Sequence, residues 1–188
     1  MKRNDSHDQF EDGLQFAASA HGDELIPGSQ IPYLAHVFLV ALEILNQLEE
    51  FHDEEPDLLL QSALLHDVLE DTKTTRMELR EKFGKEVELV VFLLSKKILS
   101  EESEDKSLDD YLAGLTNGPR SAQIIKMADR IVNLRPPPPD WTKSKICEYL
   151  EEAIEIHRRL GTANQAMADR LEKKLVQYQE RYVESAHC

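Results

Sequence analysis

Residues 62–72, SALLHDVLEDT, bring one histidine and three carboxylates together within a short helical segment. At about 100° per residue, the four ionisable side chains fall on one face of that helix and aliphatic side chains occupy the other. A solvent-exposed helix separates its residues in the same way, so periodicity alone also allows a plain acidic surface. The residue types favour a cation site, because like charges packed so closely repel each other unless a cation neutralises them. The four residues are His66, Asp67, Glu70 and Asp71.

Residues 121–135, SAQIIKMADRIVNLR, form a second helical segment with one polar and one apolar face. At helical spacing, Asp129 lies on the polar face, and the other side chains of that face are Lys126, Arg130 and Asn133. This face could supply a metal ligand together with contacts to phosphate. A single aspartate on a helix is, however, often no more than an ion-pair partner.

His36 lies in the segment IPYLAHVFLVALEIL, which is apolar on nearly all sides. By itself, such a histidine is usually a core residue with a satisfied hydrogen bond. Two imidazoles and two carboxylates together make a mixed nitrogen and oxygen shell that suits Mn²⁺, Fe²⁺, Co²⁺ or Zn²⁺. Glu70 and Asp71 are then extra carboxylates beside the metal, placed to act on a water molecule. The expected metal ligands are His36, His66, Asp67 and Asp129.

Helical periodicity and helix-breaking residues account for the rest of the chain. No segment alternates with a period of two for long enough to form a convincing strand, and no linker or internal repeat divides the chain. We therefore expect an all-α fold in a single domain spanning residues 1–188, with its core at about residues 10–183. The expected helices cover residues 10–21, 32–50, 56–71, 75–83, 86–98, 107–115, 121–135, 142–160 and 164–183.

The composition is that of a globular protein with a strong acidic excess: 41% of the residues are hydrophobic, 31% are charged, and the formal net charge is -14. No Lys or Arg occurs between Arg3 and Lys73. Such a surface repels nucleic acids and anionic membranes, which both need basic contacts. The longest apolar stretch, residues 31–45, is too short to span a bilayer, and the N-terminus lacks the apolar core of a signal peptide. A cytoplasmic location is expected, and nothing in the sequence specifies an oligomeric state.

The order of the expected ligands resembles the H…HD…D signature of HD-domain phosphohydrolases. Three longer strings are similar to the hydrolase domain of the RelA/SpoT alarmone enzymes: PYLAH at residues 32–36, ALLHDVLEDT at 63–72 and KMADRIVNLR at 126–135. Trp141 followed by Glu148 and Tyr149 resembles, in particular, the small stand-alone alarmone hydrolases of the Mesh1-like group. The resemblance extends from about Phe10 to Tyr178.

This resemblance implies a compact multi-helix bundle, the HD-domain fold. It implies hydrolysis of the 3′-pyrophosphate of guanosine tetra- or pentaphosphate, (p)ppGpp, the alarmone of the stringent response, with Mn²⁺ as the metal. The four expected metal ligands keep their role, and Glu70 and Asp71 become the pair that activates water. Asn133 is expected at the ribose or a phosphate of the nucleotide, and Tyr149 in the wall of its pocket. The chain length leaves no room for the synthetase domain of long RelA/SpoT proteins.

One loop departs from the family pattern. The loop after the first helix usually carries a pair of basic residues that meet the nucleotide, but here residues 22–32 read GDELIPGSQIP and carry none. Basic contacts to the phosphates must then come from later residues, and Lys126 and Arg130 are the expected ones. Further candidates are Arg135, Lys143, Lys145 and the pair Lys96–Lys97.

Two alternatives to a (p)ppGpp hydrolase stay open. A related HD phosphatase could act on another nucleotide phosphate, such as a deoxynucleotide or the 2′-phosphate of NADPH, and the missing basic loop favours it. A non-catalytic helical module could bind a nucleotide as a sensor, but a pure binder has no use for Glu70 and Asp71 beside a metal. The strings HDVLEDT and DRIVNLR favour the (p)ppGpp hydrolase.

Overall fold

The computed structural model describes residues 3–48, 55–96 and 107–183, and within these ranges the fold is all-α, as expected. The β-type pairing there is limited to an isolated bridge between Leu25 and Pro32. A search of the same residues finds no helix with the length and apolarity needed to cross a membrane. The elements are α1 (Arg3–His21), α2 (Leu34–Leu45), α3 (Pro56–Leu65), α4 (Val68–Asp71), α5 (Arg76–Leu94), α7 (Leu108–Thr116), α8 (Arg120–Asn133), α9 (Lys143–Leu160), the 3₁₀ turn η2 (Gly161–Ala163), α10 (Gln165–Tyr178) and the terminal turn η3 (Gln179–Val183).

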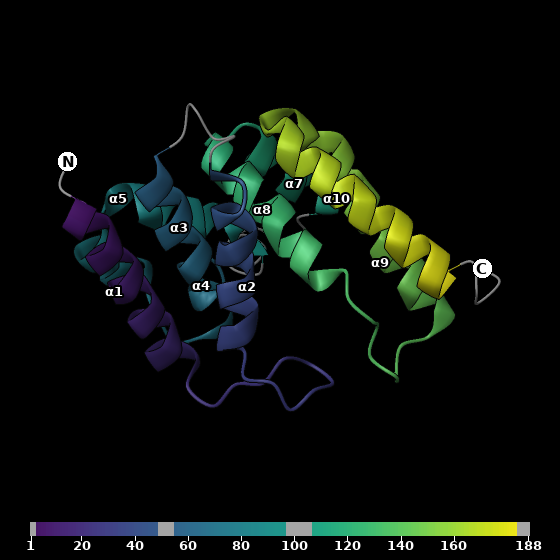
Figure 1. Cartoon of the computed structure of the whole chain (residues 1–188), viewed down its shortest axis with the longest axis horizontal. Helices are drawn as coiled ribbons and strands as arrows, with labels where there is room; N and C mark the ends of the chain where they lie inside the picture. Colours follow the sequence, from purple (N-terminus) through teal and green to yellow (C-terminus); the bar gives the residue numbers. More distant parts are fainter. Residues whose placement is uncertain (1–2, 49–54, 97–106, 184–188) are drawn as a thin grey trace.

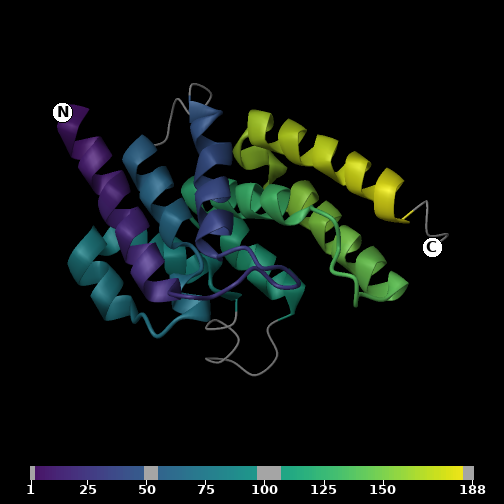
Figure 2. The same ribbon diagram turned by 60° about the horizontal axis from the view of Figure 1, so that its bottom comes forward.

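The helices form a bundle around α2, α3 and α8 (Figure 1). α1 packs along α3 on one side of this centre, and α9 and α10 pack against α8 on the other, as the rotated view also shows (Figure 2). The three central helices meet through apolar side chains that are almost completely buried, among them Val37, Val40, Ile44, Leu59, Leu64, Ile124, Met127 and Ile131. Removal of these side chains from water therefore fixes the helices that carry the expected metal ligands.

The chain turns between α3 and α4, where periodicity predicts one continuous helix over residues 56–71. α3 ends at Leu65, and His66 and Asp67 form a turn before α4 begins at Val68. The expectation of a continuous helix is therefore wrong at this point. Asp67 has φ -102° and ψ -6°, a sparsely populated conformation in which many active-site residues are found. The turn changes the direction of the Asp67 carboxylate while Val68 stays buried in the core.

α5 has two helical stretches that meet at Gly84, as the sequence predicts. Gly84 has φ 90° and ψ 170°, which only glycine adopts easily. The first stretch begins with a capping box, in which Thr75 Oγ1 accepts a hydrogen bond from the Glu78 backbone and the Glu78 carboxylate accepts one from the Thr75 backbone. The kink turns the second stretch back into the core, where it brings Leu94 towards the metal centre described below.

The remaining boundaries differ from the expected ones mainly at helix ends. α1 begins at Arg3, well before the expected start at residue 10, and α2 ends at Leu45. The expected ends at residues 50 and 98 lie outside the described residues. α8 stops at Asn133, just before the run of prolines from Pro136, as proline chemistry requires.

Replacing Gly84 by Ala should destabilise the protein by about 1–3 kcal/mol, because a Cβ strains the backbone at this φ and ψ even though no neighbour crowds the position. Gly114 in α7 is the matched control, since it has helical geometry and open space around it. Gly114→Ala should raise the free energy of unfolding by about 0.5–1 kcal/mol. Urea unfolding of both variants measures the two effects, and equal stability of Gly84→Ala and wild type would rule out strain at the kink.

Candidate metal centre and nucleotide pocket

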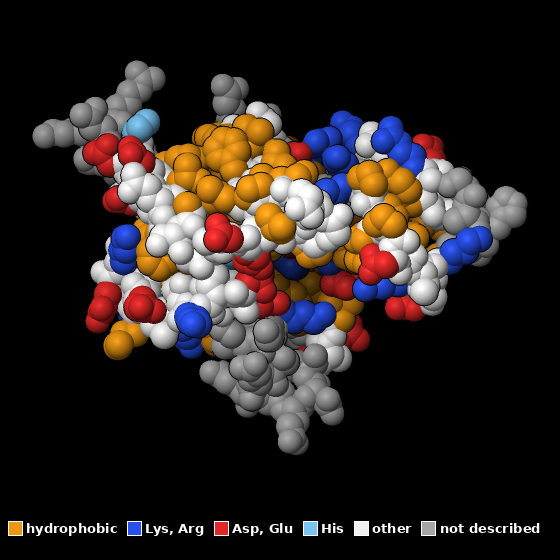
Figure 3. All heavy atoms as spheres, turned by 90° about the horizontal axis from the view of Figure 1, so that it is seen from below, with side chains coloured by type: hydrophobic (Ala, Val, Ile, Leu, Met, Phe, Trp, Pro, Cys, Tyr) orange, Lys and Arg blue, Asp and Glu red, His pale blue; other side chains and the backbone are white. Residues whose placement is uncertain are grey.

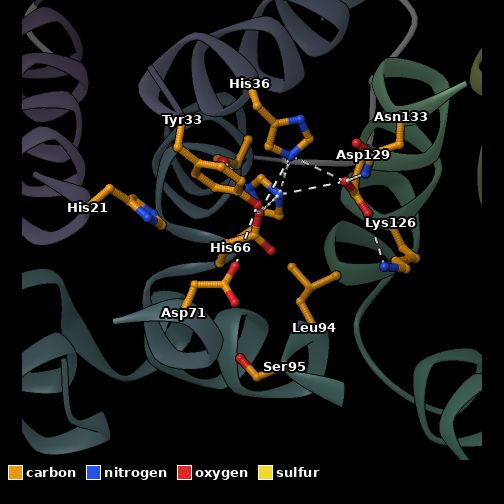
Figure 4. A network of polar contacts seen from close by, with 12 residues as sticks. His21, Tyr33, His36, His66, Asp71, Leu94, Ser95, Lys126, Asp129 and Asn133 are labelled. Atoms are coloured by element: carbon orange, nitrogen blue, oxygen red, sulfur yellow. Dashed lines mark hydrogen bonds and ion pairs between the residues drawn. The ribbon is translucent and has the colours of Figure 1, made fainter. Parts of the chain in front are cut away.

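The two expected histidine ligands and Asp129 converge at one buried point (Figure 4). Nε2 of His36 lies 3.3 Å from Nε2 of His66, and Oδ1 of Asp129 lies 3.4 Å and 3.8 Å from these two nitrogens. The three ligand atoms all lie within 4.8 Å of one another, and the three residues are 2–6% exposed. A single ion could therefore contact all three, which come from α2, the end of α3 and α8.

Asp67 joins the same point through the turn between α3 and α4. Its Oδ2 lies 2.8 Å from Nε2 of His66 and 3.4 Å from Nε2 of His36. A continuous helix would direct neighbouring side chains about 100° apart, so the turn brings the carboxylate round to its histidine neighbour. We call the four residues His36, His66, Asp67 and Asp129 the His–Asp cluster.

The imidazoles and carboxylates of the cluster shift one another's pKa values strongly. Burial alone would lower the pKa of the His66 imidazole, but Asp67 and Asp129 outweigh burial and raise this pKa to about 10. The pKa of His36 is raised as well, through the hydrogen bonds with the same two carboxylates. Burial would conversely raise the pKa of each carboxyl group, yet His66 holds that of Asp67, and Lys126 that of Asp129, well below the usual range. Positive charge is thus required here, and a divalent cation can replace the imidazole protons because metal ligands bind in their deprotonated form.

Hydrogen bonds from outside the cluster orient its members. Nδ1 of His66 lies 2.7 Å from the carbonyl oxygen of Ala63, which places a proton on Nδ1 and leaves Nε2 as the ligand atom. Lys126 Nζ donates to Oδ2 of Asp129 at 2.9 Å, and Asn133 Nδ2 donates to Oδ1 at 2.5 Å. Two residues expected to contact the nucleotide therefore also hold a metal ligand in place.

Arg135 contacts His36 from outside the cluster. Its Nη2 lies 3.2 Å from Nδ1 of the imidazole, and a guanidinium group can only donate. A cation at Nε2 of His36 needs the ring proton on Nδ1, so this contact must change when a metal binds. Arg135 lies two residues after the end of α8 and contacts the cluster through Nδ1 of His36.

Tyr33 also belongs to the site, although the sequence patterns do not indicate a role for it. Its hydroxyl donates to Oδ2 of Asp67 at 2.6 Å and lies 3.5 Å from Oδ2 of Asp71. Its ring packs between the rings of His21 and His36, at centroid distances of 4.8 Å and 5.2 Å. The available signal was the three-residue spacing of Tyr33 and His36, which places both on one side of a helix.

Glu70 and Asp71 follow the cluster on the single turn of α4. Asp71 is exposed, and its side chain points towards the cluster from the side opposite α8 (Figure 4). Burial raises the pKa of Asp71 from 3.8 to about 6, and the nearby charges of Asp67 and Glu70 add to the effect. A carboxyl group with this pKa can exchange a proton near neutral pH.

A pocket of about 210 Å³ opens beside the cluster, and we call it the proline pocket. Asn133 and Tyr149, two of the expected nucleotide contacts, line it, and Arg135 connects it to His36. Trp141 packs edge-on against Tyr149 at 4.9 Å, which gives the pocket an aromatic wall. The other residues that line the pocket are Ile26, Pro27, Pro136, Pro137, Pro138 and Tyr178.

Arg130 lies behind this wall rather than in it. Arg130 is 5% exposed as a residue, and its guanidinium group donates to Glu152 at 2.7 Å and sits 4.5 Å from the centre of the Tyr149 ring. The expected phosphate contact therefore needs a rearrangement of Arg130, and it stays a prediction. Lys126 is better exposed, with 17% of its side chain accessible beside Asp129.

The loop that lacks basic residues forms one side of the proline pocket. Ile26 and Pro27 line the pocket, and a Cβ on Gly28 would meet Cβ of Pro138 at 3.2 Å. Gly28 also has φ 74°, so both its backbone and its close contact favour glycine. The loop thus lies close against the proline run, and it offers apolar surface where the family pattern has a basic pair.

Comparison with known proteins shows the family of the chain. The family model of the HD domain matches residues 13–165. Guanosine-3′,5′-bis(diphosphate) 3′-pyrophosphohydrolase MESH1 of Danio rerio is 30% identical over 166 residues, which cover 85% of this chain and 88% of the relative. The human MESH1 protein (Homo sapiens) is 29% identical over 174 residues, covering 87% and 90%.

A solved structure gives the same result. It is described as a metazoan ortholog of SpoT that hydrolyzes ppGpp, and it superimposes with a TM-score of 0.78 at 25% sequence identity, covering 90% of this chain and 94% of that one. The chain therefore belongs to the HD-domain family, in the group that contains the MESH1 proteins.

Replacing Asp71 by Asn should stabilise the metal-free protein at neutral pH. Because the folded-state pKa of Asp71 is raised, this group contributes stability that is fully present below its ordinary pKa of 3.8 and is lost as the pH rises through about 6. Solvent screening at this exposed site limits the gain from Asp71→Asn to about 1 kcal/mol at neutral pH. Urea unfolding at neutral pH and at about pH 4 tests this, since the gain should vanish in acid. A gain that is the same at both pH values would contradict the raised pKa.

Proposed function

We propose that this protein is a metal-dependent hydrolase that removes the 3′-pyrophosphate of (p)ppGpp, giving GDP or GTP and pyrophosphate. The observation that carries the proposal is the His–Asp cluster, with Glu70 and Asp71 directly after it on α4. The relatives named as guanosine-3′,5′-bis(diphosphate) 3′-pyrophosphohydrolase support the choice of substrate. A cytoplasmic location and a role in turnover of the stringent-response alarmone follow from this activity.

The four residues of the cluster are proposed as the ligands of one divalent ion, with Mn²⁺ as the working metal. Neutral imidazole nitrogens and carboxylate oxygens form a donor set of intermediate hardness, which suits Mn²⁺ and its neighbours in the first transition series. When bound, such an ion polarises phosphate oxygens and lowers the pKa of water. The raised pKa values of both imidazoles, which the two carboxylates cause, support the fit of a cation.

Glu70 and Asp71 divide the proton transfers between them. Glu70 accepts the proton of the attacking water, since α4 sets it one helical turn beyond Asp67 and outside the cluster. Asp71 orients the water or protonates the leaving pyrophosphate. Its raised pKa of about 6 favours the second role, because more of it is protonated at neutral pH than of an ordinary carboxyl group. Tyr33 donates its hydroxyl proton to Asp67, and the same hydroxyl oxygen lies 3.5 Å from Asp71.

The nucleoside occupies the proline pocket. Trp141 and Tyr149 offer flat aromatic surfaces for a base, and the prolines exclude water from it. Asn133 lines this pocket and also donates to Asp129 of the cluster, so the phosphates pass beside it, while Lys126 contacts the other carboxylate oxygen of Asp129. Arg130 supports Tyr149 from behind and balances the charge of Glu152.

A phosphatase acting on another nucleotide is the second candidate, and a specific observation favours it. The loop against the pocket offers Ile26 and Pro27 where the family pattern has basic residues, so the pocket attracts phosphate less strongly on this side. A substrate with fewer phosphates, such as a deoxynucleotide or the 2′-phosphate of NADPH, needs fewer basic contacts.

Glu70→Gln and His66→Ala should fail in different ways. Glu70→Gln should keep the metal and substrate affinity but lose roughly 10²–10⁴-fold in kcat, the usual worth of general acid–base catalysis. His66→Ala should lose both metal and turnover. Mass spectrometry measures the bound metal of each variant, and steady-state kinetics with Mn²⁺ measure its turnover. Glu81→Gln, an exposed carboxylate on α5, is the control and should match wild type. Release of the metal by Glu70→Gln would make Glu70 a ligand and overturn this division of roles.

A substrate panel separates the candidate functions. With Mn²⁺, the protein should release pyrophosphate from (p)ppGpp faster than it releases phosphate from NADPH or deoxynucleotides. If the protein is instead a phosphatase for another nucleotide, release of phosphate from NADPH or deoxynucleotides should be the faster reaction. No release from any of them, together with nucleotide binding that Glu70→Gln leaves unchanged, would indicate a sensor and contradict hydrolysis altogether.

A further inference from the structure

α2 has an apolar side that the described part of the chain leaves partly open. The inner side of α2 is fully buried in the core through Val37, Val40 and Ile44. A helix that is apolar on nearly all sides is usually covered on all sides. Yet large side chains on the outer side of α2, and one just before it, are 36–50% exposed: Ile31, Phe38, Leu39, Leu42 and Leu45. We call these five residues the apolar α2 face.

This face is large enough for a specific protein contact. With about 200 Å² for a fully exposed residue of this size, the exposed fractions add up to roughly 400 Å². A specific dimer buries about 800 Å² on each partner, and slightly more than half of that is apolar. The apolar α2 face therefore supplies the apolar part of one standard interface.

Opposite charges lie at the two ends of the face. At one end, α1 presents exposed acidic side chains, namely Asp8, Glu11 and Asp12. At the other end, α10 presents basic side chains that line the hollows next to α2, namely Arg170, Lys173 and Lys174. Figure 3 shows this order along its upper part, with acidic side chains on the left, hydrophobic ones in the middle and basic ones on the right. Glu43, on α2 itself, is neutralised by Arg170 at 2.8 Å.

We propose that the apolar α2 face binds a second copy of this chain, with α1 of each copy over α10 of the other. A twofold contact pairs a surface with itself, so the apolar centres meet and each acidic end meets a basic end. This pairing also offsets the repulsion between two chains that each carry a net charge of -14. An acidic partner protein would use the basic residues of α10 but not the acidic residues of α1. Mutation of α1 therefore distinguishes a second copy of this chain from an acidic partner protein.

The mass of the full chain in solution, measured by sedimentation equilibrium, tests the dimer. Wild type should have the mass of two chains in the micromolar range, and Leu42→Glu that of one. Leu89→Glu on α5 is the matched control, because Leu89 is 39% exposed and Leu42 is 36% exposed. Leu89→Glu should stay dimeric, and circular dichroism melting should show that both variants fold. A wild-type chain that remains single, or equal dissociation of both variants, overturns the proposal.

Two charge-reversed chains test the orientation. One carries Lys173→Glu and Lys174→Glu, and the other carries Asp8→Lys and Asp12→Lys. Each alone should dimerise roughly tenfold or more weakly, because like charges then meet at both ends. A mixture of the two should regain wild-type affinity, since the heterodimer has opposite charges at both ends. Unchanged dimerisation of the α1 variant, or no recovery in the mixture, contradicts the placement of α1 over α10.

Discussion

The convergence of two buried imidazoles, one buried carboxylate and one partly buried carboxylate at a single point is the constraint on which the rest of the structure depends. The free energy of an isolated buried charge is prohibitive, so each member must be neutralised by another member or by a bound cation. Without a metal, His66 and Asp67 form the shortest ion pair of the cluster, and the pKa of His66 rises to about 10. A divalent ion supplies the same positive charge at the same point without protons, and the nitrogen atoms then become ligands.

Several parts of the fold fix the positions of the four residues of the His–Asp cluster. The apolar contacts of α2, α3 and α8 fix the three segments, and the turn at His66 and Asp67 aims the second carboxylate. Lys126 and Asn133 fix Asp129, and Tyr33 fixes Asp67. Asn133 also lines the proline pocket, so this one side chain contributes both to the nucleotide pocket and to the position of a metal ligand.

The sequence predicts most of this arrangement, because its signals are local. The types and order of His36, His66, Asp67 and Asp129 predict the ligand set, and helical periodicity predicts that all four lie on helices or at their ends. The turn after Leu65 is not predictable in this way, since hydrophobic periodicity continues through Val68 and Leu69 and conceals it. The burial of Arg130 is set by its contacts with Tyr149 and Glu152, which are distant in sequence. The role of Tyr33 likewise depends on contacts across the fold.

The central claim is that the His–Asp cluster is a site for one divalent ion. Electron paramagnetic resonance of Mn²⁺ titrated into the metal-free protein tests it most directly, because binding broadens the sharp signal of the free aqueous ion. We predict that the signal of free Mn²⁺ stays suppressed until one ion per chain has been added and then rises. A signal that grows from the first addition as it does in buffer would contradict the claim.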